Sequence, residues 1–231
     1  LVRRFEKEAA KVSFKAKGSG KSGLIGCSRP GQEILERTAC TVDEKNGTIR
    51  LRFEVGFPAF GRTINAGELI HILFDFLPEI VEGALLARPQ EAEDFRARAE
   101  LADDQAEARR LLSEMNLCAF VPDGAVLPRE SGVSQRPMKG AVPTESPENL
   151  AVELDLPFRG KVRGLGIPVG VTLIAGGGYH GKSTLLEALE RGVYNHVKGD
   201  GREMVITDDT AVKLRAEDGR KVTDVDISLF I

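Results

Sequence analysis

One glycine-rich segment constrains this chain of 231 residues more than any other feature. Residues 176–184 read Gly-Gly-Gly-Tyr-His-Gly-Lys-Ser-Thr, which matches the pattern Gly-x-x-x-x-Gly-Lys-Ser/Thr in full. The run 170–175 before it predicts a short buried strand, and Leu185, Leu186 and Leu189 after it mark one face of a helix. A glycine loop between a strand and a helix is typical of phosphate-binding loops. The sequence therefore predicts an α/β fold built around this loop.

The residue types of the loop suit a polyphosphate. Backbone N–H groups converge on a phosphate only where no Cβ intrudes, which explains the glycines. The N-terminus of the following helix adds unsatisfied donors and the positive end of a dipole. The nucleotide-binding residues that we predict are Gly176, Gly177, Gly178, Tyr179, His180, Gly181, Lys182, Ser183 and Thr184.

Several side chains of the loop have separate expected roles. Lys182 would reach the β- and γ-phosphates, and Thr184 would donate to the α-phosphate. The Ser183 hydroxyl would bind Mg²⁺, a hard ion that prefers oxygen ligands. His180 either bonds the γ-phosphate or points outward, and the sequence leaves both alternatives open. The expected ligands are therefore ATP and Mg²⁺.

Composition excludes several classes of protein. Hydrophobic residues are 42 % and charged residues 29 %, as in ordinary globular chains. No apolar run approaches the ~18 residues of a membrane span, so no membrane association is expected. The formal net charge is −3, so a surface for nucleic acid would have to be local. Cys27, Cys40 and Cys118 have no CxxC spacing, which argues against disulfides and zinc and favours the cytoplasm.

Strand signals come early in the chain. Thr48–Val55 alternates apolar and polar residues, which predicts a half-buried strand. The Asn46-Gly47 pair predicts a hairpin turn, with the partner strand near residues 37–42. The segment Gly18–Gly23 imitates part of a phosphate loop, and is expected to be either a flexible basic loop or an anion-binding turn.

Helix signals follow. Asn65 predicts the cap of a helix that runs through Leu77 and is interrupted by Pro78. His71 lies among apolar residues of that helix and is expected to pack in the core. Residues 90–116 predict a long helix whose charges form a solvated face.

Proline and glycine gather in residues 121–150, which predicts either a linker or an ordered crossing between domains. We therefore predict an N-terminal α+β domain over 1–150 and a partial P-loop ATP-binding domain over 151–231.

Residues 203–226 predict a small antiparallel sheet with an Asp218-Gly219 turn. Asp208 is expected to be a turn residue. The alternative is that Asp208 binds Mg²⁺ in a small P-loop kinase or phosphotransferase. His196 follows the loop helix and is expected near its C-terminal end.

A locally basic set suggests a further hypothesis, a nucleotide-regulated module that binds nucleic acid such as RNA. The alternative is that these side chains are merely solvated. The set comprises Lys15, Lys17, Lys21, Arg29, Arg50 and Arg52.

Nearly the whole chain resembles a known family, the predicted ATPases of the ABC class, which lack a membrane domain. The most specific stretches are residues 166–186, 192–196, 199–203, 215–220 and 225–228, and segments 18–23, 31–38, 120–129, 131–133 and 136–137 also look like the family. The resemblance implies that 121–150 is ordered. It also implies a homodimer that sandwiches a pair of ATP molecules.

The family's signature loop, Walker B acid and switch histidine would follow Ile231. We therefore expect an N-terminal portion with a truncated P-loop NTPase core of the ABC type. It would bind ATP with little turnover, and we assign it no catalytic residue, whereas the full-length protein would be an ATP hydrolase.

Overall fold

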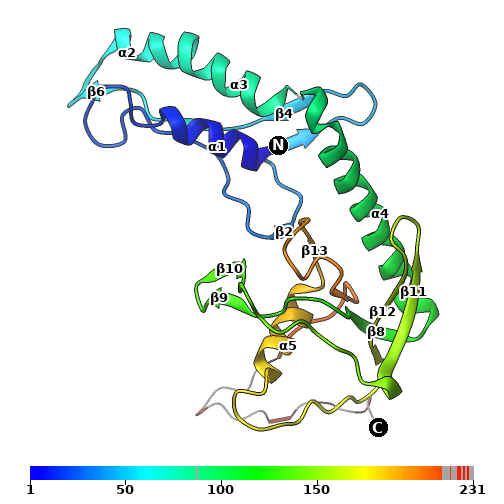
Figure 1. The fold of residues 1–231 in the computed structure, drawn as a ribbon. Coiled ribbons are helices and arrows are strands. Elements are labelled where there is room, and N and C mark those ends of the chain that lie inside the picture. The colour runs from blue at the N-terminus through cyan, green and yellow to red at the C-terminus, as the bar shows by residue number, and fades with distance from the viewer. Residues whose placement is uncertain (87, 215–218, 220–222, 225, 227, 229–231) are drawn as a thin grey trace.

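A computed structural model describes residues 1–231 apart from 87, 215–218, 220–222, 225, 227 and 229–231. Its helices and strands fall into two groups, connected by the long helix α4 (Ala92–Glu114) (Figure 1). This helix confirms the one predicted over 90–116. The mixture of helix and strand in both groups agrees with the predicted fold class.

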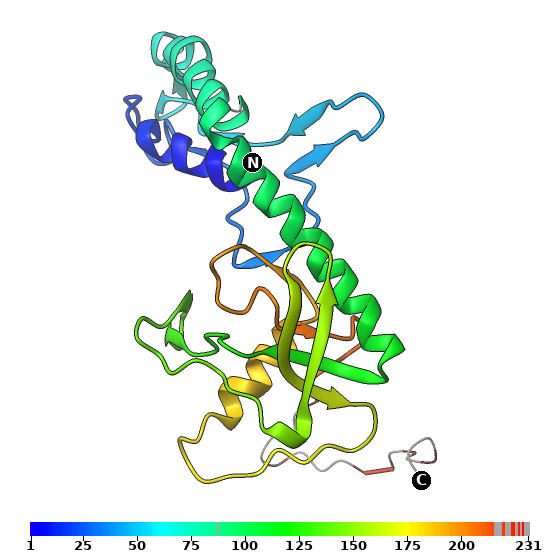
Figure 2. The ribbon, with the colours of Figure 1, turned by 45° about the vertical axis from the view of Figure 1, so that its right-hand side comes forward.

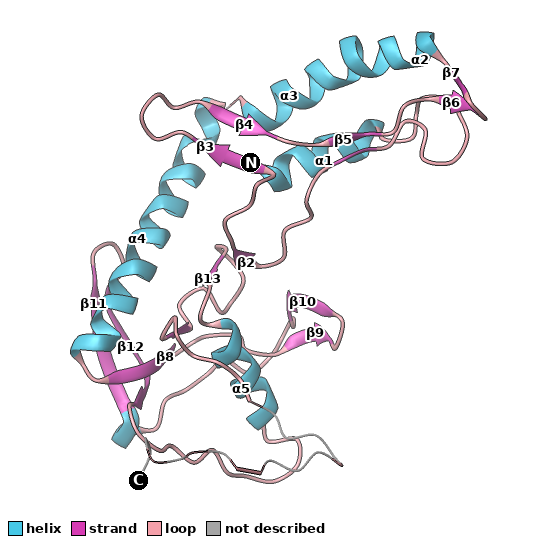
Figure 3. Cartoon of the chain, turned by 180° about the vertical axis from the view of Figure 1, so that it is seen from behind, coloured by secondary structure: helices cyan, strands magenta, loops and turns pink. Residues whose placement is uncertain are grey.

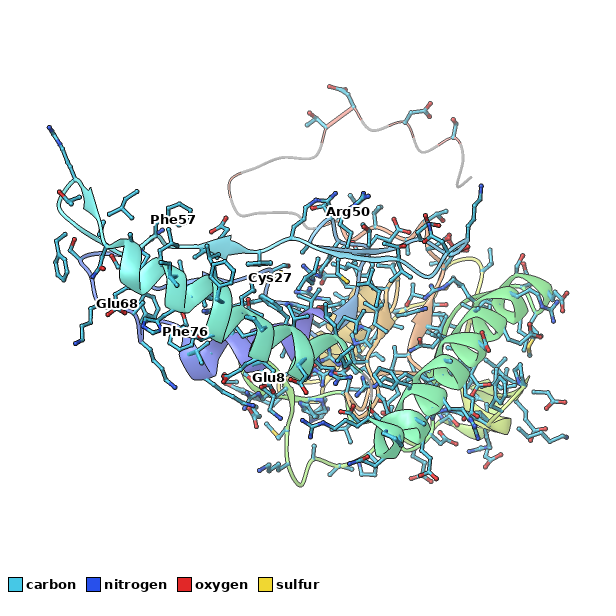
Figure 4. All side chains as sticks on the ribbon, turned by 90° about the horizontal axis from the view of Figure 1, so that it is seen from above. Glu8, Cys27, Arg50, Phe57, Glu68 and Phe76 are labelled. Atoms are coloured by element: carbon cyan, nitrogen blue, oxygen red, sulfur yellow. The ribbon has the colours of Figure 1, made fainter. Side chains whose placement is uncertain are left out.

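The N-terminal group packs helices against short strands. Helix α1 (Val2–Val12) lies along α3 (Leu77–Leu85), and β1 (Ile25–Gly26) pairs with β5 (Glu54–Val55). Their shared core contains Phe5, Ala9, Val12, Ala16, Ile25, Ile72, Ile80 and Ala84. Phe76 and Cys27 pack against this core, whereas Arg50 and Phe57 lie exposed on the outside (Figure 4).

The predicted hairpin is present. Strand β3 (Cys40–Val42) pairs with β4 (Ile49–Leu51), with Cys40 opposite Leu51. Gly47 has the positive φ of +69° that the turn requires. The single strand predicted over 48–55 is divided, because the chain changes partner after Leu51 and pairs with β1 instead.

A continuous helical rod follows Asn65, whose side chain accepts from the Glu68 N–H as predicted. It comprises α2 (Ala66–His71), a π-helical segment (Ile72–Phe76) and α3. Pro78 interrupts the α-helical hydrogen bonding as predicted, although the helical rod itself continues beyond it. In the π turn the Leu77 N–H donates to the Ile72 carbonyl, so the ladder shifts where proline lacks a donor.

His71 was expected in the core, and this prediction is wrong. Its ring is exposed, and Nδ1 lies 2.6 Å from Asp75 Oδ2. The face of the rod that packs on α1 is formed instead by Ile72, Ile80 and Ala84.

The C-terminal group contains an antiparallel sheet in the order β11-β12-β8-β14. The strands are β11 (Ala151–Leu156), β12 (Gly160–Pro168), β8 (Leu117–Pro122) and β14 (Ile206–Thr207). Helix α4 covers one face and α5 (Lys182–Arg191) the other (Figure 2). Alternation sorts the side chains, since Phe120 and Ile206 pack with α4 while Val121 and Val205 pack with Ala188 of α5.

The sheet joins residues on both sides of position 150, because β8 pairs with β12. Residues 123–150 make defined contacts: the Ser146 N–H donates to Asp123 Oδ1 at 2.6 Å, and β9 (Arg129–Ser131) pairs with β10 (Ser134–Pro137). The division of the chain at 150 stays a prediction.

A short ladder connects the two groups. Strand β2 (Glu33–Ile34) pairs with β13 (Asn195–His196), which follows α5 in the chain and lies between α5 and the N-terminal group (Figure 3). The other short elements are β6 (Ala59–Phe60), β7 (Thr63–Ile64) and 3₁₀ turns at Pro89–Glu91 and Glu148–Leu150. Across the part of the chain that is described, no helix is both long and apolar enough to cross a bilayer.

Candidate functional site

The glycine loop leads directly into α5 (Figure 1). Gly181 caps the helix with φ of +81°, and Gly176 has φ of +154°. Both values lie where a side chain is strained, so glycine is required at these two positions. The helix predicted after the loop is confirmed, with Leu185 and Leu189 packed inward, but Leu186 is exposed.

Backbone donors gather along this turn. From Gly177 to Thr184 the N–H groups have no protein acceptor within the described residues, and the first helical bond runs from the Leu185 N–H to the Gly181 carbonyl. The first turn of α5 carries no acidic residue. An anion at this end of the helix would meet unsatisfied donors and the positive end of the helix dipole.

The Lys182 ammonium already lies against the loop. Nζ donates to the carbonyl oxygens of Gly176, at 2.7 Å, and of Gly177. A phosphate among the nearby N–H groups would therefore find a cation beside it. The residues of 176–184 fit a nucleotide phosphate chain, while their individual roles remain predictions.

Tyr179 and His180 occupy the outer part of the loop. Tyr179 is fully exposed with φ of +63°. The His180 ring lies over Gly177, where an added Cβ would come within 3.1 Å of Cε1. A side chain at 177 would crowd the imidazole.

The buried strand predicted at 170–175 is not formed, which corrects that prediction. Val171 is 98 % exposed and Leu173 87 % exposed. A strand exists only where a neighbour accepts and donates its backbone hydrogen bonds. Among the described residues, no segment pairs with 170–175.

Asp208 behaves as the expected turn residue. Its side chain accepts from the Thr210 N–H at 2.9 Å and from the Thr210 hydroxyl. These hydrogen bonds from Thr210 hold the pKa of Asp208 below its usual range.

The position of Asp208 argues against the kinase alternative. The preceding residue, Thr207, donates to Leu189 and Gly192, at the C-terminal end of α5. Ser183 lies six residues before Leu189, roughly 9 Å along the helix axis. Asp208 is therefore placed at the opposite end of α5 from the proposed Mg²⁺ ligand. The hairpin predicted around Asp218-Gly219 lies largely outside the described residues.

A buried polar network, which local sequence patterns did not reveal, anchors the end of α5. His196 Nε2 lies 3.2 Å from the Arg191 carbonyl, which places His196 at the C-terminal end of the helix as predicted. Its Nδ1 lies 2.7 Å from Asp200 Oδ2, which also accepts from Arg129 at 2.9 Å. The partners come from separate segments, so only the spacing of His196 and Asp200 hinted at the network.

Arg202 lies beside this network and is buried. Burial, followed by the nearby positive charge of Arg129, lowers the pKa of Arg202 to about 10. Its guanidinium remains charged at neutral pH and donates to the Leu127 carbonyl.

The segment Gly18–Gly23 uses its donors elsewhere. The Ser19 N–H bonds the Ala59 carbonyl and the Gly23 N–H bonds the Gly56 carbonyl. This packing against residues 56–59 leaves no phosphate cradle like that of 176–184.

Comparisons with known proteins match the chain along nearly all its length. A family model described as "ATPase of the ABC class N-terminal" matches residues 1–88, and a second, described as an ABC ATPase P-loop domain, matches residues 91–231. An uncharacterized protein of Methanocaldococcus jannaschii is 33 % identical over 135 residues. That alignment covers 55 % of this chain and 30 % of the relative's length.

Proposed function

The chain belongs to the family of ATPases of the ABC class, and on this premise we propose that it binds Mg-ATP in the loop 176–184. The N–H groups from Gly177 to Thr184, which have no acceptor in the described part of the chain, and the Lys182 ammonium beside them carry this proposal. Backbone donors and one mobile cation are what a triphosphate requires of such a loop.

The test removes the cation. We expect Lys182→Ala to weaken ATP binding at least about tenfold, because a charge-assisted contact to phosphate contributes ~1.5–3 kcal/mol. Lys161→Ala is the matched control, since Lys161 lies outside the loop and its side chain pairs with Glu153 at an exposed position. Isothermal titration of both variants, with circular dichroism as the check of folding, measures the effect. Equal affinities in the two variants would refute the proposal.

We assign the Mg²⁺ contact to Ser183, at the exposed start of α5. No group of three or more metal-binding side chains occurs in the described part of the chain. One hydroxyl fits Mg²⁺ nonetheless, because this ion keeps several waters and takes phosphate oxygens as ligands. Ser183→Ala should reduce ATP affinity in the presence of Mg²⁺ and leave affinity in EDTA unchanged.

This chain by itself is proposed to turn ATP over slowly. Hydrolysis requires a residue that positions the attacking water, beyond the phosphate cradle. Asp208, which the sequence offered as an alternative Mg²⁺ ligand, is bonded to Thr210 instead and lies at the other end of α5 from Ser183. Phosphate release should therefore stay near background. Rapid release that Lys182→Ala abolishes would contradict this.

For the full-length protein we propose a homodimer that closes over ATP, by analogy with the family. Its support is the family membership. Light scattering with and without ATP tests it, since an ATP-independent monomer in the full-length protein would exclude this arrangement. The three cysteines are free, which suits the cytoplasm as the expected compartment.

RNA is a second proposed partner, held by the N-terminal group. Lys15, Lys17, Lys21 and Arg50 are all exposed, which favours contact with phosphates. Arg29 forms an ion pair with Glu6, and Arg52 donates a hydrogen bond to the Thr38 carbonyl. Binding that fails to weaken as salt is added would exclude phosphate contacts.

A further inference from the structure

A cleft of about 740 Å³ lies where the two groups of the molecule meet, lined by residues of α1, of the start of α4 and of the segment 197–198. None of its lining residues belongs to the loop 176–184. Its volume falls in the usual range for small-molecule sites, roughly 300–1,000 Å³. Eight basic and four acidic side chains line it, in a chain whose net charge is negative.

Each acidic side chain of the cleft is already neutralised by a partner. The ion pairs are Glu8 with Lys11, Glu33 with Arg191, Glu91 with Arg4 and Asp94 with Arg98. The carboxylates therefore leave the positive charge of the cleft in excess.

Two of the remaining cations are bonded to protein oxygens. Arg3 donates to Gln32 Oε1 at 3.1 Å and Arg37 to Ser28 Oγ at 3.0 Å. Lys7, Arg88 and Lys198 are exposed, and no side-chain hydrogen bond or ion pair holds them within the described residues. These three cations come from α1, from the turn before α4 and from the segment after β13.

Such a site attracts anions that carry several charges. Like charges on the walls of a concave surface reinforce one another and raise the local concentration of an opposite charge. The structure also keeps the three cations on separate elements, so a ligand with several anionic groups would contact more of them than a single anion could.

We propose that this cleft binds a small polyanion of the di- or triphosphate class through Lys7, Arg88 and Lys198. The ligand would bridge the N-terminal group and the segment 197–198, which follows β13. Because the cleft and the glycine loop share no residue, this site is independent of the ATP site proposed above.

The test uses inorganic tripolyphosphate as the probe. Every titration is made in the Lys182→Ala variant, in which binding of the probe at the glycine loop is weakened. Isothermal titration should detect binding. Adding Lys7→Ala, Arg88→Ala and Lys198→Ala together should weaken that binding at least tenfold. The matched control adds Lys45→Ala, Arg62→Ala and Lys139→Ala, which remove the same charge at exposed positions outside the cleft, and should change affinity less than about twofold. Circular dichroism shows whether each variant is folded.

Three results would overturn the proposal. One is the absence of binding in the Lys182→Ala background, and another is an equal loss in the two triple variants. The third comes from a short single-stranded RNA: if RNA binds more tightly than tripolyphosphate and its binding depends on the cleft residues, the ligand is a nucleic acid. Failure of ATP binding at the loop would show in a separate titration and would leave this test unaffected.

Discussion

At the scale of single residues, buried charged side chains gather near the C-terminal end of α5. Asp200 has no exposed side-chain surface, and its carboxylate meets both Arg129 and His196. Asp200 Oδ2 is shared between the two partners, so the network is sensitive to the loss of that carboxylate. A buried ion that loses its partner retains the cost of desolvation without the attraction that offset it.

We therefore expect Asp200→Asn to lower the free energy of unfolding by about 3 kcal/mol, since it leaves Arg129 buried without a counter-ion. Chemical denaturation measures the change. Glu153→Gln is the control, because the Glu153–Lys161 pair is exposed and should contribute under ~1 kcal/mol. Similar losses of unfolding free energy in the two variants would show that the buried Asp200–Arg129 pair contributes no more than an exposed pair.

At the scale of elements, the rod from Asn65 to Leu85 shows how a helix accommodates proline. The π segment ends at Phe76, directly before the turn that contains Pro78, whose ring nitrogen has no hydrogen to donate. Pro89, in contrast, opens a 3₁₀ turn, a position where the missing N–H has no intrahelical partner.

Replacing each of these two prolines by alanine should change the stability of the protein in opposite directions. Pro78→Ala restores a donor inside a helix, so stability should rise by about 1 kcal/mol. Pro89→Ala only loosens the unfolded chain, so stability should fall by about 0.5 kcal/mol. Thermal unfolding of both variants compares them. A fall for Pro78→Ala would mean that the π turn depends on proline for a reason other than its missing donor.

At the scale of the whole molecule, the N-terminal group contacts the end of the loop helix. Strand β2 pairs with β13, and the Val197 N–H donates to the Gln32 carbonyl at 3.0 Å. Glu33 Oε1 accepts from Arg191, the last residue of α5, at 3.0 Å. From α4, Gln105 donates to the carbonyls of His196 and Glu203, which holds the same segment from the other side.

A double-mutant cycle on Glu33 and Arg191 should give a coupling of about 0.5–1 kcal/mol, because Glu33 is nearly buried. The same cycle on Glu153 and Lys161, both well exposed, should give less. Denaturation of the single and double variants supplies both values. If the Glu33–Arg191 coupling is zero, this pair does not join the two groups.

Several features followed from local sequence because the forces behind them are local. Asn65 caps its helix through a bond to the Glu68 N–H, three residues away. Gly181 at the start of α5 and Gly47 in the hairpin turn both have a positive φ, which favours glycine. The loop 176–184 and the helix after it were predicted from the same short range of residues.

Other features depended on residues far apart in the chain. The face of the rod that α1 covers decides that His71 is exposed, and the absence of a pairing segment among the described residues decides that 170–175 is not a strand. Arg129, His196 and Asp200 meet only because the 121–150 segment brings Arg129 to the residues that follow α5.

The sequence by itself therefore determined the glycine loop, its helix and the family to which the chain belongs. Only the tertiary structure decided which polar groups are buried together and where unpaired cations line a cleft. The physical reason is range: caps, turns and helix periodicity act over a few residues, whereas burial and ion pairing depend on what the rest of the chain brings alongside.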